Sequence, residues 1–151
     1  MDGTTPVADR QAWLSVLARA PEGRLVVLCE QEGIAAPFDW LRRPEIGTVM
    51  LRGRAGAIGA PFNLGEITVT RASVQLPSGE VGHGHVQGRS KGAAQWAAVV
   101  DALMQTDRAP QVRAAVLDPL AAAMAATAQA RAEKAAATRV EFFTMVRGED
   151  Q

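Results

Sequence analysis

The chain has 151 residues, of which 48% are apolar and 21% are charged, and its formal net charge at pH 7 is zero. This length fits one domain with one ordinary hydrophobic core, and the composition excludes a disordered or membrane-embedded chain. The balanced charge also argues against generic nucleic-acid binding, which needs a strongly basic face.

The first residues and the cysteine content bear on location. The opening MDGTTPVADR has neither the basic nor the apolar part of a secretory signal, and no run reaches the ~18 apolar residues of a spanning helix. Cys29 is the single cysteine, which excludes an internal disulfide and fits a reducing compartment. Because Cys29 lies beside Leu25 and Leu28 on an apolar helical stripe, we expect a buried core residue and not a nucleophile. We expect a soluble cytoplasmic protein with no membrane contact.

Two helices are expected at the start of the chain. Asp9 is a suitable N-cap for the first, on which Trp13 and Leu17 recur at helical spacing. The second follows Pro21 and ends at Gly33. Together they would form a small helical hairpin.

A β-rich segment follows. Alternating apolar residues over 38–41 and 49–52 predict a hairpin that turns at RPEIG, residues 43–47. Residues 65–76, GEITVTRASVQL, predict a long strand. Its apolar positions change from odd to even numbers, which predicts a bulge or sharp twist near Thr70–Ala72. After a turn at 77–79, residues 81–87 add another strand, and we expect three to five antiparallel strands in all.

Two further helices complete an α+β fold in a single domain over 1–151, with flexible ends at 1–8 and 148–151. Ser90 can cap the first, whose apolar stripe is the most regular in the chain and whose Asp101 is expected to face water. After a loop around Pro110, Asp118 and Pro119 suit the start of the second, which reaches about Thr138. Eleven of its twenty residues are alanine. Such a helix either packs very closely or stands away from the core.

The last segment, RVEFFTMV, predicts a terminal strand that is apolar on both faces. Another chain would cover part of it, or it is an internal central strand. For the partner interface we single out five residues: Phe142, Phe143, Met145, Val146 and Arg147.

The segment 51–72 is rich in glycine and arginine. Its spacing of Gly53, Gly56 and Gly59 matches neither nucleotide-loop pattern, and it leads into a strand, so we expect a tight connection with positive φ. Residues 46–100 carry a local excess of three positive charges, which could hold one anion. If the strand ends converge, the following arginines could form an anion clamp: Arg52, Arg54, Arg71 and Arg89.

The two histidines, His83 and His85, share one face of the strand at 81–87, with glycines opposite. Two histidines at this spacing can share a metal, but no carboxylate follows at a useful spacing. We expect them to line a surface or pocket and to hold no metal.

Several segments together resemble one family. They are RQAWLSVLARA, RGRAGAIGAPFNLGEITVTRASVQL, the glycine-patterned run that ends at Arg89, the helix end DALM and the terminal TRVEFFTMVRG. In this order, from about Arg10 to Gly148, they resemble PhnG, a subunit family of the carbon-phosphorus lyase core complex. The two histidines are not part of the family pattern.

The resemblance implies a role in phosphonate breakdown. PhnG proteins act with PhnH, PhnI and the nucleotide-binding PhnL, so that an alkylphosphonate displaces adenine from C1 of the ribose of MgATP. PhnJ, an iron-sulfur radical enzyme, later breaks the carbon-phosphorus bond, and PhnK is a second ATP-binding-cassette subunit. The resemblance implies an accessory subunit with no catalytic residue or cofactor of its own, and MgATP as co-substrate of the complex. It also implies that the glycine-rich stretch is a connection at a subunit interface.

Two other readings stay open from the residues alone. One is a stand-alone metal-dependent or phosphate-ester hydrolase that uses His83, His85 and Arg71. The other is a binding module of some other oligomer.

Overall fold

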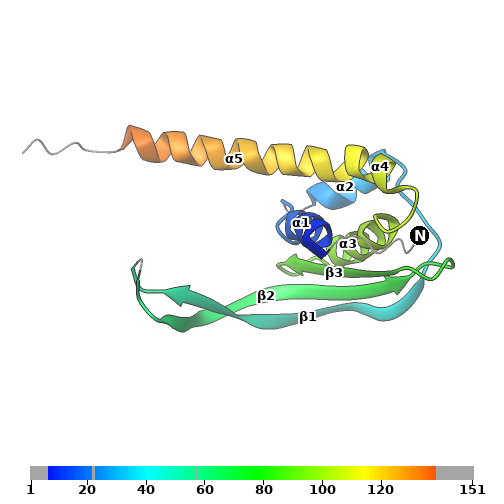
Figure 1. Ribbon diagram of the computed structural model, residues 1–151, viewed down its shortest axis with the longest axis horizontal. Helices are drawn as coiled ribbons and strands as arrows, with labels where there is room; N and C mark the ends of the chain where they lie inside the picture. Colours follow the sequence, from blue (N-terminus) through cyan, green and yellow to red (C-terminus); the bar gives the residue numbers. More distant parts are fainter. Residues whose placement is uncertain (1–6, 22, 57, 139–151) are drawn as a thin grey trace, which may run out of the picture.

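The computed structural model describes residues 7–21, 23–56 and 58–138. They form an α+β fold in which helices cover one face of a three-stranded antiparallel sheet (Figure 1). This confirms the predicted class, the antiparallel sheet and the long alanine-rich helix. The predicted terminal strand lies outside the described residues.

The N-terminal region forms helices α1 (Val7–Ala18) and α2 (Arg24–Gln31). Helix α1 begins two residues before the predicted cap, so residues 7 and 8 belong to its first turn. Residues 1–6 and 148–151, the rest of the predicted flexible ends, lie outside the described residues. Both helices bury apolar side chains against helix α3, described below.

The sheet has the order β1-β2-β3, with β1 (Asp39–Arg54), β2 (Pro61–Gln75) and β3 (Val81–Gln87). The predicted turn at residues 43–47 is wrong, because this segment lies inside β1. Pro44 lacks a backbone N–H, but β1 is an edge strand, and the pairing register shifts between Arg42 and Glu45. An edge position and a bulge together accommodate this proline.

The predicted bulge near Thr70–Ala72 is in the neighbouring strand. Strand β2 pairs with β3 in continuous register from Val69–Gln87 to Gln75–Val81. The extra residues are in β1, between Trp40 and Arg42 and between Arg42 and Glu45. The shift of apolar positions in β2 therefore marks where its covered face begins, and Ala72 and Val74 point into the core.

Helix α3 (Lys91–Leu103) is the centre of the core. The Ser90 side chain caps it, since its Oγ accepts a hydrogen bond from the Ala93 N–H at 3.1 Å. The helix lies directly on β3 because Gly82 and Gly84 have no side chains: a Cβ at either position would collide with the backbone of α3. The largest fully buried apolar side chains are Leu17, Leu25, Ile34, Val74, Val99, Val100, Leu103, Val112, Val116 and Leu120.

The loop predicted around Pro110 is helical. Helix α4 (Ala109–Val112), a π-helical turn η1 (Arg113–Leu117) and α5 (Asp118–Ala137) follow one another without a break. Pro110 fits in the first turn of α4, because the N–H groups of a first turn make no hydrogen bond within the helix. Asp118 is therefore not an N-cap, because the preceding turn already continues into α5.

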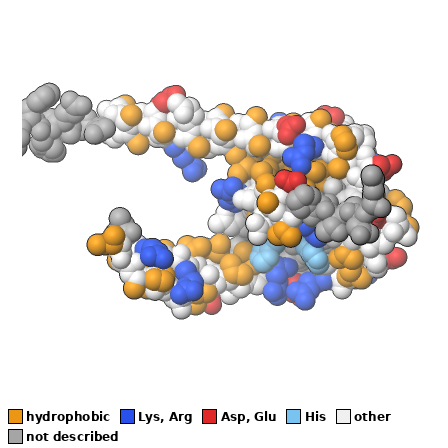
Figure 2. All heavy atoms as spheres, viewed as in Figure 1, with side chains coloured by type: hydrophobic (Ala, Val, Ile, Leu, Met, Phe, Trp, Pro, Cys, Tyr) orange, Lys and Arg blue, Asp and Glu red, His pale blue; other side chains and the backbone are white. Residues whose placement is uncertain are grey.

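Two arms extend from this body in the same direction (Figure 1). One is the distal part of α5, in which every residue from 125 to 137 is exposed. The other is the far half of the β1–β2 hairpin, which runs past the end of β3. Figure 2 shows open space between them. We expected the alanine-rich helix either to pack very closely or to stand away from the core, and the second expectation is confirmed over its distal half.

Candidate functional site

The four arginines predicted as an anion clamp do not meet within this chain. Arg52 and Arg54 lie near the tip of the β1–β2 hairpin, where Arg52 pairs with Asn63. Arg71 is eight residues further along β2, roughly 25 Å away for an extended strand. Whether any of the four touches an anion remains a prediction.

Arg71 lies in a charged group on the sheet face opposite α3. Its Nη2 donates to Glu45 Oε1 at 2.9 Å, and Arg42 Nη1 donates to the same oxygen at 3.1 Å. The bulge between Arg42 and Glu45 places both side chains on this face despite their odd spacing. Neither residue was predicted as a site residue, because the sequence indicated a turn at residues 43–47.

The two histidines lie beside Arg71. His85 is directly opposite Arg71, and His83 is opposite Ser73, whose Oγ is 2.9 Å from His83 Nδ1. Both imidazoles are exposed, as predicted for surface or pocket-lining residues. Figure 2 shows the pale blue histidines next to a group of basic side chains on the sheet.

The register arranges these side chains in two rows across the three strands. Arg42, Ser73 and His83 form one row, and Glu45, Arg71 and His85 form the other. All but Glu45 line a shallow cavity of about 350 Å³. The histidines also border a more apolar cavity of about 440 Å³ beside α1. We call the six residues of the two rows the sheet-face cluster.

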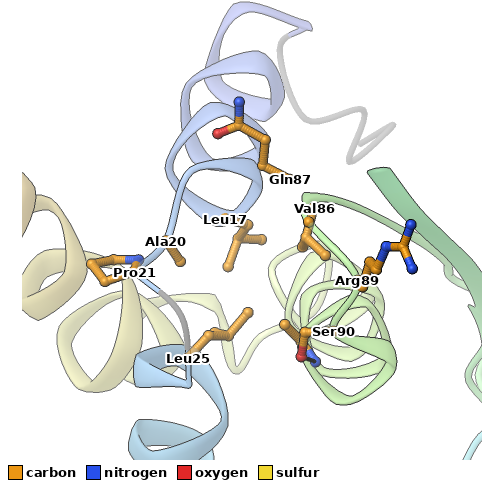
Figure 3. A pocket seen from close by; sticks show the side chains of 10 residues that line it. Leu17, Ala20, Pro21, Leu25, Val86, Gln87, Arg89 and Ser90 are labelled. Atoms are coloured by element: carbon orange, nitrogen blue, oxygen red, sulfur yellow. Dashed lines mark hydrogen bonds between the residues drawn. The ribbon is translucent and has the colours of Figure 1, made fainter. Parts of the chain in front are cut away.

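Arg89 lies apart from this cluster, just after β3 and before the Ser90 cap. It borders a cavity of about 360 Å³ whose centre is lined by Leu17, Leu25 and Val86. Figure 3 shows that the Arg89 guanidinium points away from these apolar side chains. Arg89 is thus at the rim of the cavity, next to the start of α3.

The expectation that Asp101 faces water is wrong. Asp101 is 0% exposed, and its carboxylate accepts hydrogen bonds from three residues, two on α1 and one on β3. The donors are Arg10 (3.2 and 2.7 Å), Trp13 Nε1 (2.8 Å) and the His83 backbone N–H (2.8 Å). The carboxylate therefore ties α1 and α3 to the outer edge of β3. The residues around Asp101 in the sequence look the same as those around an exposed helical aspartate. Its burial depends on partners distant in sequence, so the local sequence could not predict it.

The glycine-rich segment is the tip of the β1–β2 hairpin. Gly56 has φ +66°, and a Cβ at Gly59 would collide with the Ala55 carbonyl, so both confirm the predicted tight connection. The far half of the β1–β2 hairpin, which we call the hairpin arm, exposes five large apolar side chains: Met50, Leu51, Ile58, Phe62 and Leu64. Ile58 at the tip is 97% exposed. These residues were not singled out from the sequence, because alternation alone indicates a half-buried strand.

The residues predicted for a partner interface, Phe142, Phe143, Met145, Val146 and Arg147, lie outside the described residues. Within residues 7–138 as described, no three or more His, Cys, Asp or Glu side chains gather as a metal site would require. Cys29 is buried as predicted, and burial raises the pKa of its thiol to about 12. Among the described helices, none combines the length and apolar character that crossing a bilayer demands.

Comparison with known proteins gives the family. The family model described as phosphonate metabolism protein PhnG matches residues 8–148. The chain belongs to the PhnG family. It is also 46% identical, over 144 residues, to alpha-D-ribose 1-methylphosphonate 5-triphosphate synthase subunit PhnG of Rhizobium meliloti (strain 1021). That alignment covers 95% of this chain and 92% of the relative, so the resemblance seen in the sequence is confirmed over nearly all of its length.

Proposed function

We propose that this chain is an accessory subunit of an alpha-D-ribose 1-methylphosphonate 5-triphosphate synthase in phosphonate degradation. The observation that carries the proposal is the 46% identity to a subunit of that name, which extends over nearly the whole of both chains. In the reaction, an alkylphosphonate oxygen bonds to C1 of the ribose of MgATP as the C1–N bond to adenine breaks. The 5-triphosphate stays intact.

The shape of the molecule supports a role as a subunit. The hairpin arm exposes five large apolar side chains, and residues 125–137 of α5 are exposed to solvent. Large apolar side chains that an isolated chain leaves exposed are often buried where subunits meet. We propose that both arms bind other subunits of the synthase.

The proposed partners follow from the family resemblance. PhnH, PhnI and PhnL would take part in the transfer step, and PhnJ and PhnK would belong to the same cytoplasmic assembly. MgATP would enter as a co-substrate of the complex, and this chain would carry no cofactor of its own.

Reconstitution tests the proposal. The partner subunits are mixed with MgATP and methylphosphonate, with or without this chain, and released adenine is measured by chromatography. We expect release only when this chain is present together with its partners. Undiminished release in its absence would contradict the proposal.

The same assay tests the hydrolase reading. We expect the isolated chain to release neither adenine nor phosphate from MgATP. Hydrolysis by the isolated chain that disappears in the His83→Gln variant would instead support a stand-alone hydrolase.

A further inference from the structure

The sheet-face cluster joins cationic and polar side chains from all three strands. Arg42 comes from β1, Arg71 and Ser73 from β2, and His83 and His85 from β3. They line one cavity of about 350 Å³, and Arg42, Arg71 and both histidines are exposed to solvent there. With both histidines neutral, the two arginines and Glu45 leave a formal charge of +1 on the cluster.

The guanidinium groups already converge on an anion. Arg42 and Arg71 donate to the same oxygen, Glu45 Oε1, at 3.1 and 2.9 Å. Guanidinium groups bind carboxylate and phosphate oxygens with the same planar geometry. The Glu45 side chain is about half exposed, so an incoming phosphate oxygen can reach the position that this carboxylate holds.

The size of the cluster indicates which anion fits. Neighbouring strands are about 4.8 Å apart, so three strands span roughly 10 Å, and the two rows add about 7 Å along the strands. A single phosphate can contact one row or the centre of the cluster. A chain of two or three phosphates can contact both rows, with Arg71 and His85 on one side and His83 and Arg42 on the other.

We propose that the sheet-face cluster binds a diphosphate or triphosphate group, with Arg71 as its main ligand and Glu45 as an internal competitor. The inference stands on the cluster geometry, and it deepens the proposed function, since the relative is named for a 5-triphosphate product. It assigns to this chain a direct contact with the phosphate end of a substrate or product.

The sequence offers a specific readout, because His83 and His85 are its only histidines. The isotope-labelled full chain is titrated with inorganic pyrophosphate at fixed pH and ionic strength, and the imidazole signals are followed by NMR. We expect both to shift and to saturate. Shifts that are absent, or that grow without saturation, would overturn the proposal.

Four variants sharpen the test. Arg71→Gln should weaken pyrophosphate binding at least about tenfold, because it removes a charge-assisted hydrogen bond. Glu45→Gln should tighten it several-fold, because it removes the competing charge at nearly the same size. Arg113→Gln, the matched control, loses the same charge on η1 and should bind as the wild type does. His85→Gln should weaken binding and leave the His83 signals as the readout.

Orthophosphate separates a single-phosphate site from the proposed one. We expect it to bind several-fold more weakly than pyrophosphate, and equal affinity would contradict the two-row assignment. The proposal would be overturned if the Arg71→Gln variant bound pyrophosphate as tightly as the wild type and had an unchanged circular-dichroism spectrum. The titration uses the isolated chain, so its failure leaves the adenine-release test of the proposed function unaffected.

Discussion

A buried carboxylate connects the first helix, the central helix and the edge of the sheet. Asp101 has no exposed surface, and all four of its hydrogen bonds come from groups distant in sequence. One donor, the His83 N–H, lies on the outer edge of β3, where no further strand pairs with it among the described residues. The carboxylate thus gives a partner to one backbone N–H that strand pairing leaves open.

Asp101→Asn should destabilise the fold by about 2 to 3 kcal/mol, because an amide cannot accept the same set of hydrogen bonds and leaves Arg10 without its counter-charge. The free energy of unfolding is measured by urea denaturation. The control is Glu133→Gln on the exposed part of α5, which should change it by less than about 0.5 kcal/mol. If both variants changed the free energy of unfolding by the same small amount, the buried network would contribute little to stability.

Cys29 should be inert in the folded chain. Burial raises the pKa of its thiol to about 12, so the reactive thiolate is scarce at pH 8. We expect alkylation at pH 8 to be at least about a hundredfold slower than in denaturant. The labelling rate is measured by mass spectrometry. Equal labelling rates in both states would contradict the buried environment.

The same burial predicts a pH dependence. Because the pKa of the Cys29 thiol is higher in the folded chain than in the unfolded chain, the free energy of unfolding should fall as the pH rises above about 9.

Two glycines of β3 set the distance between α3 and the sheet. Gly82 and Gly84 lie under the backbone of α3, and the histidines between and after them point to the other face. Because side chains alternate along a strand, β3 packs on α3 through its glycines and contributes its histidines to the sheet-face cluster on the other face.

Gly84→Ala should be strongly destabilising, by about 3 kcal/mol or more, because the new Cβ must push α3 away from β3. Gly47→Ala is the matched control, since a Cβ there meets nothing within 4 Å. The two melting temperatures are compared by calorimetry. Similar values for both variants would contradict the close packing.

Periodicity predicted the helices α1, α2, α3 and α5 and most of the long strand β2, since each signal is local, but it did not predict α4 and η1, where Pro110 indicated a loop. The single strand β1 was not predictable, because Pro44 and Gly47 indicate a turn unless the strand is known to be at an edge. Arg42 and Glu45 were missed for the same reason, since only the bulge places them beside Arg71. Helical spacing placed Asp101 on the outer side of α3, and only the tertiary contacts of α1 and β3 bury it.

The body and the two arms of the molecule differ in how they are stabilised. The body buries α3 on nearly all sides, whereas the hairpin arm and distal α5 expose much of their surface. The hairpin arm exposes five large apolar side chains that the fold of this chain leaves uncovered. We therefore propose that the body stabilises the fold and that the arms bind other subunits.

Association of the arms with other subunits is tested most directly by one variant. Met50→Asp combined with Phe62→Asp changes two exposed side chains of the hairpin arm, 51% and 44% accessible. The tagged wild type, the double variant and a Gln111→Asp control at the opposite end are each co-expressed with PhnH and PhnI. The co-purified partner is quantified by mass spectrometry.

We expect the double variant to melt within a few degrees of the wild type and to retain less than about a tenth of the partner, since two buried charges cost several kcal/mol at an interface. The Gln111→Asp control should retain the partner fully. Full retention by the double variant, at an unchanged melting temperature, would contradict the assignment of the hairpin arm to association.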